Sequence, residues 1–272
     1  MNLRVGFIGG GNMAEAFISA FVDGELLLPS QISVSDVLKE RLDYLKEKYG
    51  VKTYLCNLQV VTESDVIFLA VKPQVMTTVL KEVAGSLYPS QIVVSMAAGY
   101  PIRKIEEIIG DDKKVVRIMP NILVKIRKGV VAYCDNKRLL DEERKYVKEL
   151  LSTCSEVFDL DEKLFDAVTA LAGSGPAFVF LILEALSDGG VKLGLPRDVA
   201  LKLATQVLIG SAEMVRAGEH PEVLKDKVTS PAGTTIAGLS ALEENRTRFA
   251  LIKALEEACK RSVEITKLVE GM

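Results

Sequence analysis

Residues 3–21 read LRVGFIGGGNMAEAFISAF, and this segment decides the fold. A short apolar run from Val5 to Ile8 leads into three consecutive glycines, Gly9, Gly10 and Gly11. A helical pattern follows at once, with its apolar residues on one face. A glycine turn between a strand and a helix is the context in which the pattern G-x-G-x-x-G/A predicts a dinucleotide-binding site.

Each small residue of this turn has a physical role in that interpretation. Gly9 allows the sharp turn, Gly11 lets the backbone approach a pyrophosphate, and Ala14 lets the helix pack closely on the strand. The helix N-terminus adds free N–H groups and the positive end of a helix dipole. The alternative is an ordinary tight connection between strand and helix, and the strand–turn–helix context at the start of the chain favours the cofactor site.

The composition narrows the class of protein. The chain has 272 residues, 49% hydrophobic and 26% charged, as in a soluble globular protein of one large or two ordinary domains. A net charge of −3 without a basic block argues against nucleic-acid binding. The cysteines form no C-x-x-C pair, His220 is the single histidine, and the N-terminus lacks a charged-then-apolar signal. We therefore expect a cytoplasmic protein without disulfides, a metal site or a Ser-His-Asp triad.

The order of patterns predicts an α/β fold in two domains. Up to about residue 160, short β-branched runs alternate with helical patterns, which indicates βαβ units and a Rossmann-type, mostly parallel sheet with helices on both faces. Strands are expected at 32–35, 66–71, 92–96 and 115–119, with edge strands of undetermined direction at 130–133 and 156–160. Helices are expected at 39–48, 75–87, 102–109 and 142–151, and longer ones at 164–186, 197–216 and 248–268. The predicted domains are 1–161, which binds the dinucleotide, and 162–272, which is all-α.

The run 167–183, AVTALAGSGPAFVFLIL, is apolar all round. It is shorter than the roughly 20 residues that a membrane span needs, and Gly-Ser-Gly-Pro interrupts it. A helix that is apolar all round is usually buried, and a helical domain of about 110 residues has difficulty enclosing one alone. We therefore expect burial against a second subunit, in a homodimer at least, and no membrane partner.

Asp36 ends the second predicted strand, 22 residues beyond Ala14. An acid at this position accepts hydrogen bonds from the ribose hydroxyls of NAD. The alternative is a helix N-cap, and one side chain could serve both roles. A carboxylate should repel the additional phosphate of NADP, although Lys39 or Arg41 could offset that repulsion. The choice between NADH and NADPH therefore stays open.

Three later strand ends carry unusual turns. They are Ala-Val-Lys-Pro at 70–73, Ala-Ala-Gly at 97–99 and Met-Pro-Asn at 119–121. Ligands bind outside the carboxyl ends of the strands in an open α/β sheet, so these turns should line one crevice. Each turn taken alone could equally be helix or loop punctuation.

The second predicted domain contains a polar turn at 229–235, Thr-Ser-Pro-Ala-Gly-Thr-Thr. This turn opens a helix, and unpaired N–H groups at a helix start suit a carboxylate. The hydroxyls of Thr234 and Thr235 add hydrogen-bond donors and acceptors. The alternative is that Ser230 or Thr234 is only an N-cap.

At these residues the chain resembles the pyrroline-5-carboxylate reductases. The signature of that family matches residues 221–243, and the resemblance extends to 166–169, 173–177 and 188–197. In the first domain GFIGGGNM, AVKP, AAG and MPN match as well, so that the resemblance covers nearly the whole chain.

The resemblance implies an activity and a set of site residues. The family reduces the ring C=N of 1-pyrroline-5-carboxylate to L-proline by hydride transfer from NADH or NADPH, as obligate dimers that often assemble further and whose active sites are completed by both chains. The implied nucleotide contacts are Gly9, Gly10, Gly11, Asn12, Met13, Asp36, Asn57, Ala70, Val71, Lys72, Pro73, Ala97, Ala98 and Gly99. The implied substrate contacts are Ser230, Gly233, Thr234 and Thr235, with the Thr235 hydroxyl bonded to the ring nitrogen as the catalytic contact.

The sequence departs from the family pattern at two places in these motifs. Ala232 stands where the family usually has glycine, and Ile122-Leu123 replaces Thr-Pro after Met-Pro-Asn. Two other interpretations remain: a reductase that acts on β-hydroxy acids, for which Lys192 or Lys202 would be the catalytic lysine, and a non-catalytic nucleotide-binding sensor. The long match to the substrate motif favours the imine reductase over both.

Overall fold

A computed structural model describes residues 3–271 as two compact units. The first unit combines Met1–Ser174 with Ala258–Met272, and the second unit is Gly175–Glu257. The break therefore comes 13 residues later than the predicted domain boundary, and the end of the last helix belongs with the first unit. Side-chain contacts explain the difference, because Asp166 accepts hydrogen bonds from the hydroxyls of Ser262 (2.6 Å) and Thr266 (3.2 Å).

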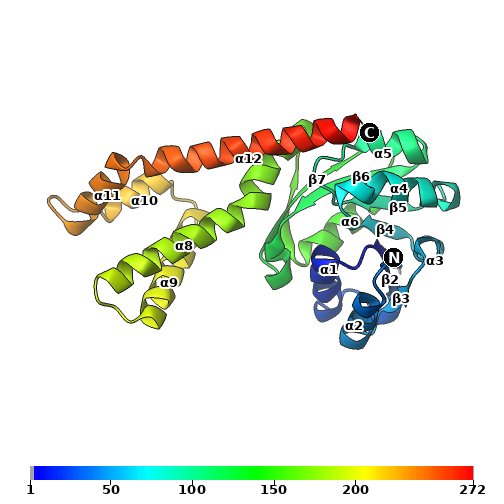
Figure 1. Ribbon diagram of the computed structural model, residues 1–272, viewed down its shortest axis with the longest axis horizontal. Helices are drawn as coiled ribbons and strands as arrows, with labels where there is room; N and C mark the ends of the chain where they lie inside the picture. The colour runs from blue at the N-terminus through cyan, green and yellow to red at the C-terminus, as the bar shows by residue number, and fades with distance from the viewer. Residues whose placement is uncertain (1–2, 272) are drawn as a thin grey trace. The chain divides into compact units, whose positions relative to one another are not determined.

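The first unit is an eight-stranded sheet covered by helices on both faces (Figure 1). Its strands are β1 (Val5–Ile8), β2 (Ile32–Ser35), β3 (Lys52–Tyr54), β4 (Val66–Leu69), β5 (Ile92–Ser95), β6 (Lys114–Pro120), β7 (Gly129–Asp135) and β8 (Ser155–Asp159). Its helices are α1 (Asn12–Asp23), α2 (Lys39–Tyr49), α3 (Asn57–Glu63), α4 (Pro73–Val83), α5 (Ile102–Ile109), α6 (Asp141–Ser152) and α7 (Phe165–Val168). Short 3-10 turns are η1 (Pro29–Gln31), η2 (Ala84–Ser86), η3 (Ile122–Ile126) and η4 (Glu162–Leu164), and the π-helical turn η5 (Thr169–Ser174) follows α7.

The strand order confirms the doubly wound α/β prediction. The order is β3-β2-β1-β4-β5-β6-β7-β8, and the first six strands are parallel. β7 runs antiparallel to β6, and β8 runs parallel to β7, which fixes the direction that the sequence left open. The order of the strands changes direction between β1 and β4: β2 and β3 lie on one side of β1, and β4 to β6 lie on the other. Folds of this kind bind ligands outside the carboxyl ends of the strands at this point.

Two apolar clusters hold the sheet between its helices. One joins buried side chains of α1, α2 and α6 to one face of the strands, and the other joins α3, α4, α5 and Val269 to the opposite face. In the first cluster Phe7 of β1 stacks on Phe68 of β4 with ring centroids 4.9 Å apart, and Phe17 and Phe21 of α1 contact the same pair. These rings pack the middle and the end of α1 against β1 and β4.

The second unit is helical throughout and has almost no core. It contains α8 (Gly175–Lys192), α9 (Arg197–Arg216), α10 (Pro221–Lys227), α11 (Thr234–Glu244) and most of α12 (Thr247–Glu270). Within Gly175–Glu257, the buried residues are Pro176, Ser187, Ala200 and Ala204. Large apolar side chains such as Leu181 (65% exposed) and Val207 (61%) face outward from the isolated chain. A unit of this kind needs a partner surface to be stable in water.

Candidate functional site

The turn after β1 has the geometry that its glycines predict. Gly9 has φ +97°, and a Cβ there would lie 2.8 Å from the Ala70 carbonyl oxygen, so this position requires glycine. Gly11 precedes α1 with no side-chain cap, and a Cβ there would have nothing within 4 Å. The N–H groups at the start of α1 are therefore left for a ligand, and the space above Gly11 is open.

Asp36 at the end of β2 is joined directly to this turn. Its Oδ2 accepts a hydrogen bond from the Gly10 N–H at 2.8 Å, and its Oδ1 accepts one from the Leu38 N–H at 2.9 Å. Helix α2 begins after Leu38, which provides no side-chain cap. Asp36 thus orders the connection to α2 without being its N-cap, and its remaining oxygen lone pairs are available to a ligand.

Glu15, a buried carboxylate on α1, binds two cationic side chains of α2, Arg41 and Lys48. Glu15 accepts hydrogen bonds from Arg41 (2.5 Å), Tyr44 (2.9 Å), Lys48 (3.0 Å) and Tyr49 (3.0 Å). Burial alone would raise the pKa of Glu15, but these donors outweigh it and lower the pKa to about 2. Glu15 therefore stays charged at any physiological pH, and it joins α1 to α2 beside the glycine turn.

The other predicted nucleotide contacts follow neighbouring strands at the same sheet edge. Asn57 begins α3, where its Oδ1 accepts from the Ser35 hydroxyl at 2.8 Å and its amide nitrogen donates to Glu82 at 2.8 Å. Lys72 is exposed and caps the start of α4 through its backbone, with Pro73 as the first residue of that helix. The register of β2, β1, β4 and β5 thus gathers the turns after all four strands at one edge.

The turn that contains Gly99 is closed by packing against another helix. Gly99 has φ +68°, and a Cβ there would lie 2.8 Å from the Ile265 side chain and 3.1 Å from the Thr266 nitrogen. The turn 97–99 therefore packs against the end of α12, and Ala97 and Gly99 are buried. Packing against α12 therefore explains the glycine at position 99, and its contact with the nucleotide stays a prediction.

The Met-Pro-Asn turn after β6 is held by its own asparagine. The buried Asn121 donates to the Ala172 carbonyl at 3.1 Å and accepts from the N–H groups of Leu123 and Val130, each at 3.2 Å. Asn121 is therefore fully used in joining β6, β7 and η5. The Ile122 side chain, one of the family departures, is 42% exposed at the start of η3.

The polar turn of the second unit opens helix α11 without a side-chain cap. Gly233 is the N-cap residue, and its own N–H donates to the Ser230 carbonyl at 3.1 Å. Neither Ser230 nor Thr234 caps the helix, so the alternative of a simple N-cap is not what this turn does. Thr234 is exposed and Thr235 half-buried, and both stand in the first turn of α11 together with its free N–H groups.

Ala232 has φ +55°, in the left-handed region that favours glycine. The family glycine at this position is therefore explained by the backbone of the turn, and alanine tolerates the same conformation at a cost of about 1–2 kcal/mol. The departure changes the side chain but keeps the shape of the turn.

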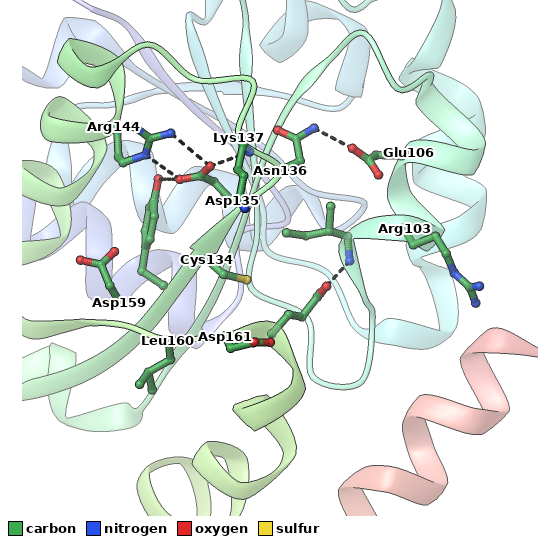
Figure 2. A pocket seen from close by; sticks show the side chains of 13 residues that line it. Arg103, Glu106, Cys134, Asp135, Asn136, Lys137, Arg144, Asp159, Leu160 and Asp161 are labelled. Atoms are coloured by element: carbon green, nitrogen blue, oxygen red, sulfur yellow. Dashed lines mark hydrogen bonds and ion pairs between the residues drawn. The ribbon is translucent and has the colours of Figure 1, made fainter.

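A separate hollow of about 1030 Å³ lies between α5 and the ends of β7 and β8 (Figure 2). Arg144 pairs with Asp135 across 2.8 Å at one end, and at the other the Ile102 N–H donates to Glu162 at 2.8 Å. None of the predicted site residues line it. Sequence reasoning gave no signal for this hollow, because its residues are scattered between 102 and 162.

Comparison with known proteins agrees with this architecture. Residues 162–265 match the family described as pyrroline-5-carboxylate reductase dimerisation, and residues 4–99 match the one described as NADP oxidoreductase coenzyme F420-dependent. A pyrroline-5-carboxylate reductase of Methanosarcina acetivorans is 39% identical over 98% of this chain and 99% of its own length. A pyrroline-5-carboxylate reductase of Arabidopsis thaliana is 41% identical over 98% of this chain and 96% of its own length.

A solved structure shares the fold over almost the same length. The Plasmodium falciparum pyrroline carboxylate reductase, crystallised with NADP bound, superimposes with a TM-score of 0.90 at 32% identity, covering 97% of this chain and 98% of that one. The match to a dimerisation family spans the region that has almost no core of its own, which makes this chain a homo-oligomer. The chain belongs to the pyrroline-5-carboxylate reductase family.

Proposed function

We propose that this chain reduces the ring C=N bond of 1-pyrroline-5-carboxylate to L-proline by hydride transfer from a reduced nicotinamide nucleotide, the last step of proline synthesis. The observation that carries the proposal is a pair of uncapped helix starts. Helices α1 and α11 both begin at glycines, Gly11 and Gly233, and neither has a side-chain cap. Each leaves N–H groups for an anion, and the reaction brings two: the pyrophosphate of the cofactor and the carboxylate of the substrate.

The residues of the first unit fit the nucleotide. The glycine turn is open where a pyrophosphate must approach, and Asp36 presents acceptor oxygens for ribose hydroxyls. The residues that would hold the nucleotide are Gly9–Met13, Asp36, Asn57, Ala70–Pro73 and Ala97–Gly99. When bound, the reduced nicotinamide supplies the hydride. Lys72 is exposed at the start of α4, directly after Ala70 and Val71, which pack against Gly9, and we assign it no role beyond contact with the nucleotide.

The second unit supplies the substrate side. The N–H groups around Gly233, Thr234 and Thr235 bind the carboxylate, with Ser230 in the same turn. The Thr235 hydroxyl donates or accepts a hydrogen bond at the ring nitrogen. A protonated imine is already electrophilic, so the chain needs no nucleophile or metal for this step. Holding the two reactants together is worth up to about 7–11 kcal/mol in well-oriented systems, which exceeds any single hydrogen bond.

The assembly follows from the exposed apolar helices. We propose a homodimer at least, whose subunits cover the apolar side chains of α8 and α9 and complete each other's sites. Among the described residues, one helical stretch, Glu162–Lys192, is long and apolar enough by length and composition to cross a membrane. The dimerisation match covers this same stretch, which supports a partner subunit rather than a membrane as the cover of its apolar surface. We further propose a cytoplasmic location and no nucleic-acid partner.

A direct assay tests the proposal. Purified protein is mixed with pyrroline-5-carboxylate and either NADH or NADPH, and nucleotide oxidation is followed together with the appearance of proline. We expect both to occur in equal amounts. Oxidation with a β-keto acid partner in place of the imine would identify the hydroxy-acid reductase, and nucleotide binding without oxidation would identify the sensor.

A further inference from the structure

We propose that this chain selects NADH over NADPH, because Asp36 is fixed as a carboxylate at the ribose end of the nucleotide site while the cations that follow it are held by other acids. The inference rests on the proposed function, which leaves the two nucleotides open. It concerns three residues of the first unit: Asp36, Arg41 and Glu15.

The Asp36 carboxylate is fixed by neutral donors alone. Its two oxygens accept from the backbone N–H groups of Gly10 (2.8 Å) and Leu38 (2.9 Å), so its orientation is set while its negative charge is kept. Such a carboxylate accepts hydrogen bonds from the ribose hydroxyls of NADH. The extra phosphate of NADPH carries about −1.5 to −2 charges at neutral pH, and two anions in contact repel strongly in a partly desolvated site.

Arg41 is the side chain best able to neutralise that phosphate, and it is already occupied. Its Nε donates to the Gly10 carbonyl at 2.5 Å, and one terminal nitrogen contacts the Gly11 carbonyl at 3.4 Å and Glu15 at 2.5 Å. Its guanidinium also stacks over the Tyr44 ring, with 5.0 Å to the centroid. The side chain of Arg41 is 23% exposed and that of Glu15 is 12% exposed, so solvent screens this pair only in part.

Two further cations of α2, Lys39 and Lys48, are also paired. Lys39, the first cation after Asp36, lies 2.6 Å from Asp43 on the same helix. Lys48 donates to Glu15 at 3.0 Å and to the Tyr44 hydroxyl. To bind a 2′-phosphate, Arg41 would have to leave both Glu15 and the turn carbonyls, leaving a buried carboxylate with fewer donors. Glu15 is thus a positioning residue that keeps Arg41 on the turn.

Nucleotide titrations without the imine test the inference. Quenching or transfer of fluorescence gives the Kd of NADH and of NADPH for the wild-type homo-oligomer. We expect NADH to bind at least about tenfold more tightly, which is about 1.4 kcal/mol. Equal or tighter binding of NADPH would overturn the inference.

Two variants locate the cause of the preference. Asp36→Asn keeps an acceptor oxygen for the Gly10 N–H but removes the charge, and Asp36→Ala removes both; each should lower the ratio of the NADPH Kd to the NADH Kd by about tenfold. Glu15→Gln should lower the Kd of NADPH relative to that of NADH by a smaller factor. A neutral amide binds Arg41 more weakly than the carboxylate and lets the guanidinium reach the phosphate. Glu40→Gln, at an exposed acid of α2, removes the same charge and should leave the ratio unchanged. An unchanged ratio in both Asp36 variants, with unchanged melting temperatures, would overturn the assignment.

Failure of this inference and failure of the proposed function have different signatures. The titrations contain no imine, so absence of imine reduction with either nucleotide would sink the proposed function without changing the two Kd values. Reduction that runs faster with NADPH when the two nucleotides are compared at the same concentration, below either KM, would sink only the cofactor preference.

Discussion

At the scale of single residues, the clearest contrast is between two glycines of the same turn. Gly9 has a positive φ and a backbone oxygen 2.8 Å from where its Cβ would be, whereas Gly11 has φ −67° and open space. The first glycine is therefore required for folding, and the second is free of any structural demand. Gly11 has no structural reason within the chain to be glycine, which supports its predicted contact with the nucleotide.

Replacing each glycine by alanine separates these roles. Gly9→Ala should lower the free energy of unfolding by about 1–3 kcal/mol, because the strained φ and the contact with Ala70 act together. Gly11→Ala should leave thermal stability within about 0.5 kcal/mol of wild type but raise the Kd of the nucleotide at least about tenfold. Chemical denaturation and fluorescence titration measure the two effects, and wild-type binding by Gly11→Ala would remove the turn from the site.

The Thr235 hydroxyl can supply only a small part of the rate enhancement in the proposed reaction. A single hydrogen bond to the ring nitrogen is worth about 1–3 kcal/mol, against a larger contribution from positioning. Thr235→Ala should therefore lower kcat about ten- to a hundredfold without abolishing it. Thr235→Ser, which keeps the hydroxyl, is the matched control and should recover most of the rate. Unchanged turnover in Thr235→Ala would exclude the hydroxyl from the mechanism.

At the scale of elements, α1 and α2 are joined through one buried acid. Glu15 lies on the side of α1 that faces α2 and receives two cations and two phenols there. The glycine turn is tied to α2 by the same group of contacts, through Arg41 and Asp36. The proposed ribose end of the nucleotide site therefore depends on the packing of these two helices.

Glu15→Gln should destabilise the protein by about 2–3 kcal/mol at neutral pH, since its pKa of about 2 lies well below its ordinary value of 4.5. The stabilisation is fully present above pH 4.5, where the carboxylate is charged in both folded and unfolded chains. It is lost as the pH falls from about 4.5 towards 2. Denaturant titrations across this range should show the gap between wild type and variant closing in acid. A gap that does not change with pH would contradict a charged Glu15.

At the scale of the whole molecule, the second unit is explained only by assembly. Its helices leave apolar side chains exposed along α8 and α9, and only four buried residues lie within 175–257. The hydrophobic effect favours covering such surface at about 25 cal/mol per Å². Folding of the second unit and association of the subunits are therefore expected to be coupled.

A charge placed on the exposed face of α8 should break the oligomer. Leu181→Asp, at a side chain 65% exposed, should shift the sedimentation profile to monomer and lower the melting temperature. Leu28→Asp, at a side chain 66% exposed in the first unit, is the matched control and should leave the oligomer intact. A wild-type chain that sediments as a stable monomer at working concentration would contradict the assembly.

The sequence by itself determined the order of the elements in the first unit. Alternating β-branched runs and amphipathic helices specify βαβ units, and the observed β2 and α5 have the expected bounds, 32–35 and 102–109. It missed β3 and α3, because an edge strand of three residues and a helix of seven carry too little periodicity to detect. Glycines, Asp36 and the polar turn at 229–235 were also found from local pattern, since each is a short-range signal.

Only the tertiary structure decided what those residues contact. Gly99 packs on α12 from more than 160 positions away, the carboxylate of Asp166 receives hydroxyls from the same helix, and Arg41 is held by Glu15 on another helix. The break between units at 174/175 and 257/258 follows from such contacts and not from composition. Local sequence sets backbone preference and hydrophobic periodicity over a few residues. Which cation pairs with which carboxylate depends on the order of the strands in the sheet and on the helices that this order brings together.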